Sequence, residues 1–319
     1  MAKISVLMGV YNKSARLKES INSVLNQSFK DFELILINDG SSDHSGEICD
    51  IFAKKESRIK VYHQSNKGVS YTRNRAINLS NSEFISFLDA DDTYESDFLE
   101  KMIKKINISD SDVCYCGHNY VSSRKTKARF NFKTGSILVD YLKNKCTPNT
   151  NSWLIRKAFI FKHNIKFQED LNFGEDMLFF SEILLNSKNT VCVNEYLTNY
   201  FLNITNSLSE NSIEKITLDL LWLNLLKEKV ILNPNIHFSL KKKAILTINN
   251  YRIPGSIIYR FNKNFNELLK INLMEHYYLI HFKHLNNFSF VNGVRSLKLY
   301  YYKFKFIIKF YYHRFKEEI

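Results

Sequence analysis

The sequence predicts an α/β fold with a mostly parallel sheet, followed by a mainly helical C-terminal extension. Three observations lead to this fold class. Short apolar runs alternate with segments of helical periodicity up to about residue 90, polar residues cluster directly after each apolar run, and amphipathic helical segments dominate from about residue 211. Strands and helices that alternate in this way form a sheet with helices on both faces.

Apolar runs of strand length predict the first four strands at residues 4–10, 33–38, 59–63 and 84–88. Helical spacing of apolar residues predicts the intervening helices near residues 17–25, 48–52 and 71–79. After Thr93 the pattern is mixed, with strands expected near residues 113–120 and 191–201 and helices near residues 137–144 and 176–185. The chain therefore continues from α/β into α+β.

Composition excludes several protein classes. The 319 residues contain only 9 glycines and 3 prolines, which excludes collagen-like and proline-rich chains. The five cysteines form an odd set without paired spacing, and the N-terminus lacks the pattern of a secretion signal, so we expect a reduced, cytoplasmic protein. No apolar stretch reaches the roughly 18 residues of a membrane-spanning helix, so we expect none.

Positive charge is concentrated in the C-terminal quarter. The net charge is +13, and residues 241–319 hold 15 Lys or Arg against 4 acidic residues, which leaves +2 for residues 1–240. Residues 297–316 place lysines on one side of a predicted helix and aromatic side chains on the other. Such a helix is typical of binding to an anionic membrane surface, although packing or homodimer formation would use the same pattern.

The segment Asp89-Ala90-Asp91-Asp92 holds three carboxylates directly after an apolar strand. Their mutual repulsion would be relieved by a hard divalent cation such as Mg²⁺ or Mn²⁺, which prefers oxygen ligands and also binds phosphates. The alternative is a solvated turn in which Asp92 caps the next helix.

Two further polar segments follow the second and third strands. Residues 38–43 (NDGSSD) combine a tight turn with Asp39, whose carboxylate can accept a hydrogen bond from a base or ribose. The alternative is an ordinary strand-to-helix turn in which Asp43 caps the helix. Residues 66–74 (NKGVSYTRN) place a flexible loop before a helix that presents Arg73. The amides of the helix start and the Arg73 guanidinium suit binding of a diphosphate. The alternative is that Arg73 is an ordinary surface charge.

Two carboxylates, Glu175 and Asp176, begin an apolar helix after Gly174. They complement the helix dipole, or one of them serves as a general base. The cluster Cys114-Tyr115-Cys116-Gly117-His118 superficially suggests zinc, but no fourth ligand is evident and core cysteines are the favoured interpretation.

Taken together and in this order, SVLMGVYN, ELILINDGSSD, NKGVSYTRN, FISFLDADD and FGEDMLF resemble the family 2 glycosyltransferases, which have the GT-A fold. The resemblance covers about residues 3–210. It implies a catalytic domain at residues 1–210 with a Rossmann-like sheet, and leaves residues 211–319 as a basic, mainly helical region for membrane-surface binding or oligomerisation.

The resemblance implies an inverting enzyme that moves one hexose or N-acetylhexosamine from a UDP-sugar to a saccharide acceptor. Neither Trp153 nor Trp222 lies in the Q-x-x-R-W motif of processive synthases, which favours single additions. The implied setting is bacterial capsule, exopolysaccharide or lipooligosaccharide biosynthesis on a lipid-linked acceptor, with the protein peripheral to the inner face of the cell membrane.

The resemblance also implies roles for individual residues. Asp176 would be the general base and Glu175 would orient the acceptor, while Asp91, with Asp89, would bind the Mn²⁺ or Mg²⁺. The remaining expected nucleotide-sugar contacts are Val10, Tyr11, Asn12, Asp39, Asn66, Gly68, Arg73, Asp89 and Ala90. Ser207 would approach the metal or the phosphates.

The sequence departs from the family pattern at several positions, among them Gly9 and Thr72. Gly9 stands where a proline is common, which predicts a looser turn, and Thr72 stands where alanine is usual. Three alternatives remain open: a catalytically silent partner subunit, a nucleotidyltransferase that releases pyrophosphate, and a nucleic-acid-binding protein. The acidic crevice, separate from the basic tail, argues against a nucleic-acid partner.

Overall fold

The computed structural model describes residues 2–202, 215–253 and 256. Residue contacts divide the chain into two units. One is formed by Met1–Asn206 with Asn233–Ile236, and the other by Ser207–Leu232 with His237–Ile319.

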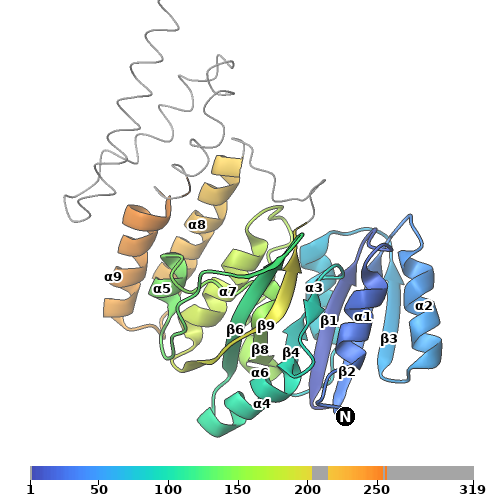
Figure 1. Ribbon diagram of the computed structural model, residues 1–319. Helices are drawn as coiled ribbons and strands as arrows, with labels where there is room; N and C mark the ends of the chain where they lie inside the picture. The colour runs from blue at the N-terminus through green and yellow to red at the C-terminus, as the bar shows by residue number, and fades with distance from the viewer. Residues whose placement is uncertain (1, 203–214, 254–255, 257–319) are drawn as a thin grey trace, which may run out of the picture. The chain divides into compact units, whose positions relative to one another are not determined.

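Within the described residues, nine strands form one mixed sheet in the first unit (Figure 1). The strand order is β3-β2-β1-β4-β8-β6-β9-β5, with β7 paired to β6. The bounds are β1 Ile4–Val10, β2 Phe32–Asp39, β3 Ile59–Gln64, β4 Phe84–Phe87, β5 Thr93–Tyr94, β6 Val113–Val121, β7 Lys125–Lys127, β8 Trp153–Arg156 and β9 Thr190–Phe201.

The pairing directions confirm the predicted α/β class. Strands β3, β2, β1 and β4 are parallel, and so are β6 and β9. Strand β8 is antiparallel to both β4 and β6, and β5 is antiparallel to β9. The sheet is therefore a parallel half joined through an antiparallel strand to a second half, as expected for a chain that passes from α/β to α+β.

Helices follow the parallel strands as the periodicity predicts. In the first unit they are α1 Leu17–Leu25, α2 Ser45–Lys55, α3 Val69–Leu79, α4 Phe98–Ser109, α5 Leu138–Leu142, α6 Lys157–Lys162 and α7 Glu175–Asn186, with a short 3₁₀ turn at Thr150–Ser152. The described part of the second unit is also helical, with α8 Lys215–Leu232, α9 Phe238–Thr247 and a π-helical turn at Ile248–Arg252.

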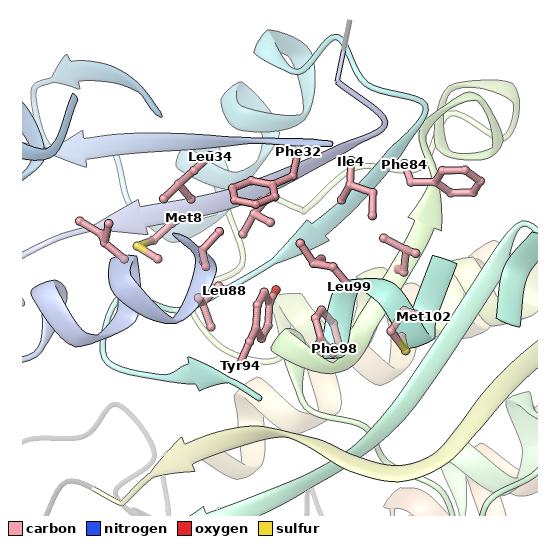
Figure 2. Packing of buried hydrophobic residues seen from close by; sticks show 14 of the residues in the cluster. Ile4, Met8, Phe32, Leu34, Phe84, Leu88, Tyr94, Phe98, Leu99 and Met102 are labelled. Carbon is pink, nitrogen blue, oxygen red and sulfur yellow. The ribbon is translucent and has the colours of Figure 1, made fainter. Parts of the chain in front are cut away.

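The main core lies between the parallel strands and helices α1, α2 and α4 (Figure 2). Alternate residues of a strand point to opposite faces of a sheet. Ile4 and Met8 of β1 accordingly join a buried cluster with Phe98 and Met102 of α4, whereas Leu7 is buried outside that cluster. Strands β1, β2 and β4 are buried on both faces and are almost continuous apolar runs, whereas the edge strand β3 is partly exposed and contains polar residues.

The two departures at Gly9 and Thr72 compensate each other. Gly9 lies inside β1, paired with Ile37, and a Cβ atom added there would approach the Thr72 methyl group to 2.9 Å. The Thr72 side chain thus occupies space that a larger residue at position 9 would need. The expectation of a looser turn at Gly9 is wrong, because the residue is held in the strand ladder.

All five cysteines are buried with free thiols. Cys114 and Cys116 lie in the core cluster on β6, as the core interpretation predicts. His118 of the same strand is also buried, and burial lowers its pKa to about 4.

Among the described helices, none is long and apolar enough to cross a membrane. The basic amphipathic helix predicted at residues 297–316 and the residue Ser207 lie outside the described residues.

Candidate active site

The loops that follow β1 and β2 are bonded to each other at one edge of the sheet. Asn12, which has a positive φ of 52°, accepts a hydrogen bond at Oδ1 from the backbone nitrogen of Ser42 (2.8 Å). The backbone nitrogen of Lys13 donates to Ser45 Oγ (2.8 Å), and that of Ser14 donates to Asp43 Oδ2 (3.0 Å). The predicted polar segments after the first two strands therefore form one connected surface at the carboxyl edge of the sheet, where open α/β sheets bind ligands.

Asp43 organises the start of α2. Its carboxylate accepts hydrogen bonds from the backbone nitrogens of Ser14 and Ser45. Burial raises its pKa, but the hydrogen bonds from Ser45 and Ser14 outweigh burial and lower the pKa to about 2. The structural interpretation of Asp43 is therefore the better one, since both carboxylate oxygens are used to hold backbone.

Asp39 is buried and orders the loop between β3 and α3. Its carboxylate accepts hydrogen bonds from the backbone nitrogens of Lys67 (2.8 Å) and Gly68 (3.0 Å) and from Gln64 Nε2 (2.7 Å). Gly40 permits the close approach of this loop to the residues after β2, because a Cβ atom at position 40 would lie 2.7 Å from the backbone nitrogen of Asn66. Asp39 thus shapes the loop that carries Asn66 and Gly68, while its contact with a base remains a prediction.

Two of the expected contact residues have buried side chains. The side chain of Val10 is 1% exposed and belongs to the core cluster, and Ala90 is 2% exposed with its carbonyl oxygen bonded to Ser20 Oγ. Both side chains contribute to packing in this structure, and a contact of either residue with a nucleotide stays a prediction. Tyr11, by contrast, is 49% exposed.

Arg73 joins two of the predicted carboxylates. Its guanidinium contacts Asp89 Oδ1 at 3.0 Å and Glu175 Oε1 at 3.2 Å, and its side chain is only 11% exposed. Burial lowers the pKa of Arg73, but the carboxylates of Asp89, Glu175 and Asp176 together raise it. The surface-charge interpretation of Arg73 is therefore wrong, because its guanidinium pairs with Glu175, which lies 102 positions further along the chain.

Glu175 and Asp176 begin α7 after Gly174, which takes a positive φ of 79°. Burial, and next the charge of Asp176, raise the pKa of Glu175. Asp176 Oδ1 accepts a hydrogen bond from the backbone nitrogen of Met177 (2.7 Å), whereas Oδ2 has a long contact of 3.5 Å with Thr150 Oγ1. The weakly held Oδ2 atom is the better placed of the two to accept a proton, because a contact of 3.5 Å is at the limit of a hydrogen bond.

Asp92 is a structural carboxylate. It is 1% exposed, and it accepts hydrogen bonds from the backbone nitrogen of Phe201 (2.9 Å) and from Asn151 Nδ2. Burial, followed by the charge of Asp89, raises its pKa to about 8. The expected helix cap is wrong, because α4 begins only at Phe98, and Asp92 instead ties the turn to the end of β9.

Asp91 points into a different environment. Its Oδ2 atom forms an ion pair with the Nζ atom of Lys13, and its backbone carbonyl oxygen accepts a hydrogen bond from Arg16 Nε (3.1 Å). The Arg16 guanidinium also lies 3.5 Å from the centroid of the Phe201 ring. Two cations from the loop after β1 therefore contact Asp91.

The carboxylates suit a hard divalent cation. Within the described residues, no group of three or more His, Cys, Asp or Glu side chains converges to hold a metal by itself. Mg²⁺ and Mn²⁺ prefer oxygen donors, and Mg²⁺ usually takes one or two carboxylates and completes its shell with water and substrate phosphates. Asp91 and Asp89 are oxygen donors of this kind, so the residues fit such an ion when a diphosphate is also bound.

Several residues at the site had no distinct signal in the sequence. Asn151 bonds the backbone nitrogen of Asp89 (2.8 Å) as well as Asp92, and Thr150 contacts Asp176. Burial, and next the charges of Asp92, Asp89 and Asp91, raise the pKa of Tyr200 to about 12. The signal for Lys13 was its place directly after Tyr11-Asn12, whereas Asn151 and Tyr200 come from segments that only folding brings here.

No signal in the sequence indicated the structural role of Asn74, although this residue is the last of the segment at residues 66–74. Its amide bonds both the backbone nitrogen (2.9 Å) and the carbonyl oxygen (2.8 Å) of Phe167. The Phe167 ring stacks on Phe179 of α7 at 3.9 Å and lies 5.2 Å from the Arg73 guanidinium. Asn74 thereby links α3 to the segment that precedes Gly174.

Known proteins resemble the chain both in sequence and in structure. Glycosyltransferase GlyG of Streptococcus pneumoniae is 35% identical over 130 residues, which cover 40% of this chain and 42% of that protein. Cholesterol galactosyltransferase of Borreliella burgdorferi is 28% identical over 292 residues, which cover 82% of this chain and 80% of that protein. The chain matches between 18% and 42% of the length of the first four curated relatives.

Two solved structures share the fold. Staphylococcus aureus TarS in complex with UDP-GlcNAc superposes with a TM-score of 0.68 at 21% identity, covering 86% of this chain and 77% of that one. The mannosyltransferase PcManGT of Pyrobaculum calidifontis, in complex with GDP-Man and Mn²⁺, superposes with a TM-score of 0.58 at 12% identity, covering 81% and 73%.

The sequence model of the family described as Glycosyl transferase family 2 matches residues 5–171, a span that contains β1 to β8 and the residues Asp39, Arg73, Asp89 and Asp91. The GT-A fold predicted from the ordered motifs is confirmed by the structural neighbours. The chain belongs to glycosyl transferase family 2.

Proposed function

We propose that the protein transfers a single hexose or N-acetylhexosamine from a UDP-sugar to a hydroxyl group of a saccharide acceptor, with inversion at the anomeric carbon. The observation that carries this proposal is the bridge formed by Arg73. One guanidinium contacts Asp89, at the end expected to hold the nucleotide, and Glu175, beside the expected base. Donor and acceptor groups would therefore meet around one buried cation.

The donor half of the site is supported by the loop that Asp39 holds. Asn66 on this loop and Tyr11 after β1 are exposed, and Arg73 supplies a positive charge for a diphosphate. The neighbour TarS has been solved in complex with UDP and in complex with UDP-GlcNAc, which supports a uridine nucleotide as the donor carrier here.

A divalent cation, Mn²⁺ or Mg²⁺, would be held by Asp91 and Asp89. When bound, such an ion stabilises the negative charge that develops on the leaving diphosphate. Arg73 would contribute to the same task, because its charge is fixed by the surrounding carboxylates before the reaction begins. The complex of PcManGT with GDP-Man and Mn²⁺ supports this assignment.

Asp176 would act as the general base. The acceptor oxygen attacks the anomeric carbon, the bond from that carbon to the diphosphate oxygen breaks, and the acceptor proton passes to Asp176 Oδ2. One displacement of this kind inverts the configuration at the anomeric carbon. Glu175 is engaged by Arg73, which suits it to orient the acceptor rather than to take the proton.

The acceptor is proposed to be lipid-linked, in the synthesis of bacterial capsule, exopolysaccharide or lipooligosaccharide at the inner face of the membrane. Residues 297–316 would supply the contact with anionic lipid. A second candidate acceptor, the hydroxyl group of a lipid alcohol, is supported by the similarity to the cholesterol galactosyltransferase, which aligns over most of both chains.

The test begins with calorimetric titration of the protein with UDP and a panel of UDP-sugars, with Mn²⁺ and then with EDTA. Asp176→Asn should keep donor binding and lose transfer by at least about a hundredfold, the usual contribution of a general base. Asp170→Asn removes a nearby exposed carboxylate and should leave both unchanged.

Other outcomes would identify the alternatives. Full transfer by Asp176→Asn would remove Asp176 as the base. Release of pyrophosphate instead of UDP would indicate a nucleotidyltransferase. If no nucleotide sugar binds under any condition, the proposed activity is wrong and a silent partner subunit becomes the better description.

A further inference from the structure

The Lys13–Asp91 ion pair lies where the proposed metal would bind. The Lys13 ammonium contacts Asp91 Oδ2, one of the two oxygens that this carboxylate can offer to a cation. Lys13 belongs to the first loop of the sheet and Asp91 to the turn after β4, so 78 residues separate the partners in the chain. This lysine has no part in the roles described above.

The backbone around Lys13 is held in place from several directions. The Lys13 nitrogen donates to Ser45 Oγ, the Ser14 nitrogen donates to Asp43 Oδ2, and Arg16 Nε donates to the carbonyl oxygen of Asp91. The loop is thus fixed to α2 on one side and to the turn of Asp91 on the other. This framework holds the Lys13 backbone within side-chain reach of Asp91.

The two partners differ in exposure. The Lys13 side chain is 39% exposed and that of Asp91 is 16% exposed, so the carboxylate is fixed while the ammonium borders solvent. An ammonium and a divalent cation repel each other when both are within a few ångströms of one carboxylate. Binding of a metal to Asp91 therefore moves Lys13 into solvent or onto another anion, and a diphosphate bound at the site would be one.

We propose that Lys13 is an internal counter-cation that competes with the divalent metal for Asp91. The free protein then binds metal weakly, and a nucleoside diphosphate strengthens metal binding by pairing with Lys13. The second half of this statement rests on the proposed function, whereas the first half concerns the protein and the metal alone. Metal and nucleotide would each raise the affinity of the other by the same factor.

The test is the affinity for Mn²⁺, measured by the electron paramagnetic resonance signal of the free ion and by calorimetry. Without nucleotide, Lys13→Met should bind Mn²⁺ about tenfold more tightly than the wild type, the order expected for one close charge pair near a protein surface. Lys13→Arg keeps the charge and should bind as weakly as the wild type. Lys18→Met removes an exposed lysine of α1 and serves as the matched control.

Other results would contradict the proposed role of Lys13. If Lys13→Met binds Mn²⁺ no more tightly than the wild type, or if neither binds it measurably, competition by Lys13 does not control the metal and the proposal is overturned. Addition of UDP should tighten Mn²⁺ binding more in the wild type than in Lys13→Met, and an equal gain would overturn the second half. If UDP binds to no variant, the proposed function fails, while the nucleotide-free comparison still decides the role of Lys13.

Discussion

Asp91 and Asp92 are adjacent in the chain and chemically identical, yet the fold places them in opposite environments. Asp91 contacts Lys13 and Arg16 from the loop after β1, at the carboxyl edge of the sheet. Asp92 is buried and accepts hydrogen bonds from the Phe201 backbone and from Asn151. One carboxylate thus has a partner that a ligand can replace, and the other has partners that belong to the core.

The difference shows that adjacent carboxylates can have separate roles, one in stability and one in ligand binding. A buried carboxylate with bonded oxygens stabilises one conformation, because its removal leaves buried donors without acceptors. A carboxylate paired with a partly exposed ammonium can exchange that partner for another cation at little cost in stability. We therefore expect substitution of Asp91 to change chemistry and substitution of Asp92 to change folding.

The largest effect is expected from Asp91→Asn. Transfer should fall by about a hundredfold to a thousandfold, as it does when one strong electrostatic contact to a developing charge is lost. The free energy of unfolding should change by no more than about 0.5 kcal/mol, since the ion pair that is lost borders solvent. Initial rates and urea denaturation together check this, and a large loss of stability with normal transfer would reverse the comparison.

The next effect is on stability, from Asp92→Leu. The change leaves the Phe201 nitrogen and the Asn151 amide without their acceptor, which should lower the free energy of unfolding by about 3 kcal/mol. Asp92→Asn keeps one acceptor oxygen and should lose less. Urea unfolding measures the stability of both variants. If they are as stable as the wild type but inactive, the structural role of Asp92 is wrong.

The smallest expected effect is the contribution of the buried His118 imidazole to the pH dependence of stability. Burial lowers the pKa of His118 from 6.5 to about 4, so its imidazole is neutral in both states above pH 6.5. Between about pH 6.5 and pH 4 the unfolded chain binds a proton that the folded chain does not, and stability falls by at most about 1.4 kcal/mol per pH unit. His118→Gln removes this contribution.

The measurement for His118 is the urea midpoint at pH 7.5 and at pH 5.5. The wild type should lose more stability between the two values than His118→Gln does. An equal loss in both proteins would mean that the His118 imidazole gains its proton in the folded state as readily as in the unfolded state.

The parallel half of the sheet and most of the candidate site followed from the sequence. The residue patterns predicted β1 to β4 to within two residues at each end; β1, β2 and β4 are apolar because both of their faces are covered, whereas the edge strand β3 is partly polar. Asp89, Asp91, Arg73, Glu175 and Asp176 follow strands or begin helices, and the topology brings the ends of parallel strands to one edge. The places of Asp89 and Asp91 at this edge were predictable for that reason.

Other parts of the site were beyond prediction. Asn151 and Tyr200 reach it from segments whose pairing order, β4-β8-β6-β9, is not written in any local pattern. The burial of Val10 and Ala90 was missed because a motif places residues near a ligand without showing which way each side chain points. The compensation between Gly9 and Thr72 likewise depends on a helix lying against a strand.

By itself, the sequence determined the family, the α/β class and the set of polar residues at the ends of the strands, since these depend on local periodicity and on the order of short motifs. Only the tertiary structure decided which carboxylate of the turn is buried, that Arg73 joins Asp89 to Glu175, and that Lys13 contacts Asp91. The physical reason is that burial and charge pairing are properties of segments far apart in the chain. Neighbouring residues of the same type acquire different functions only when distant elements pack around them.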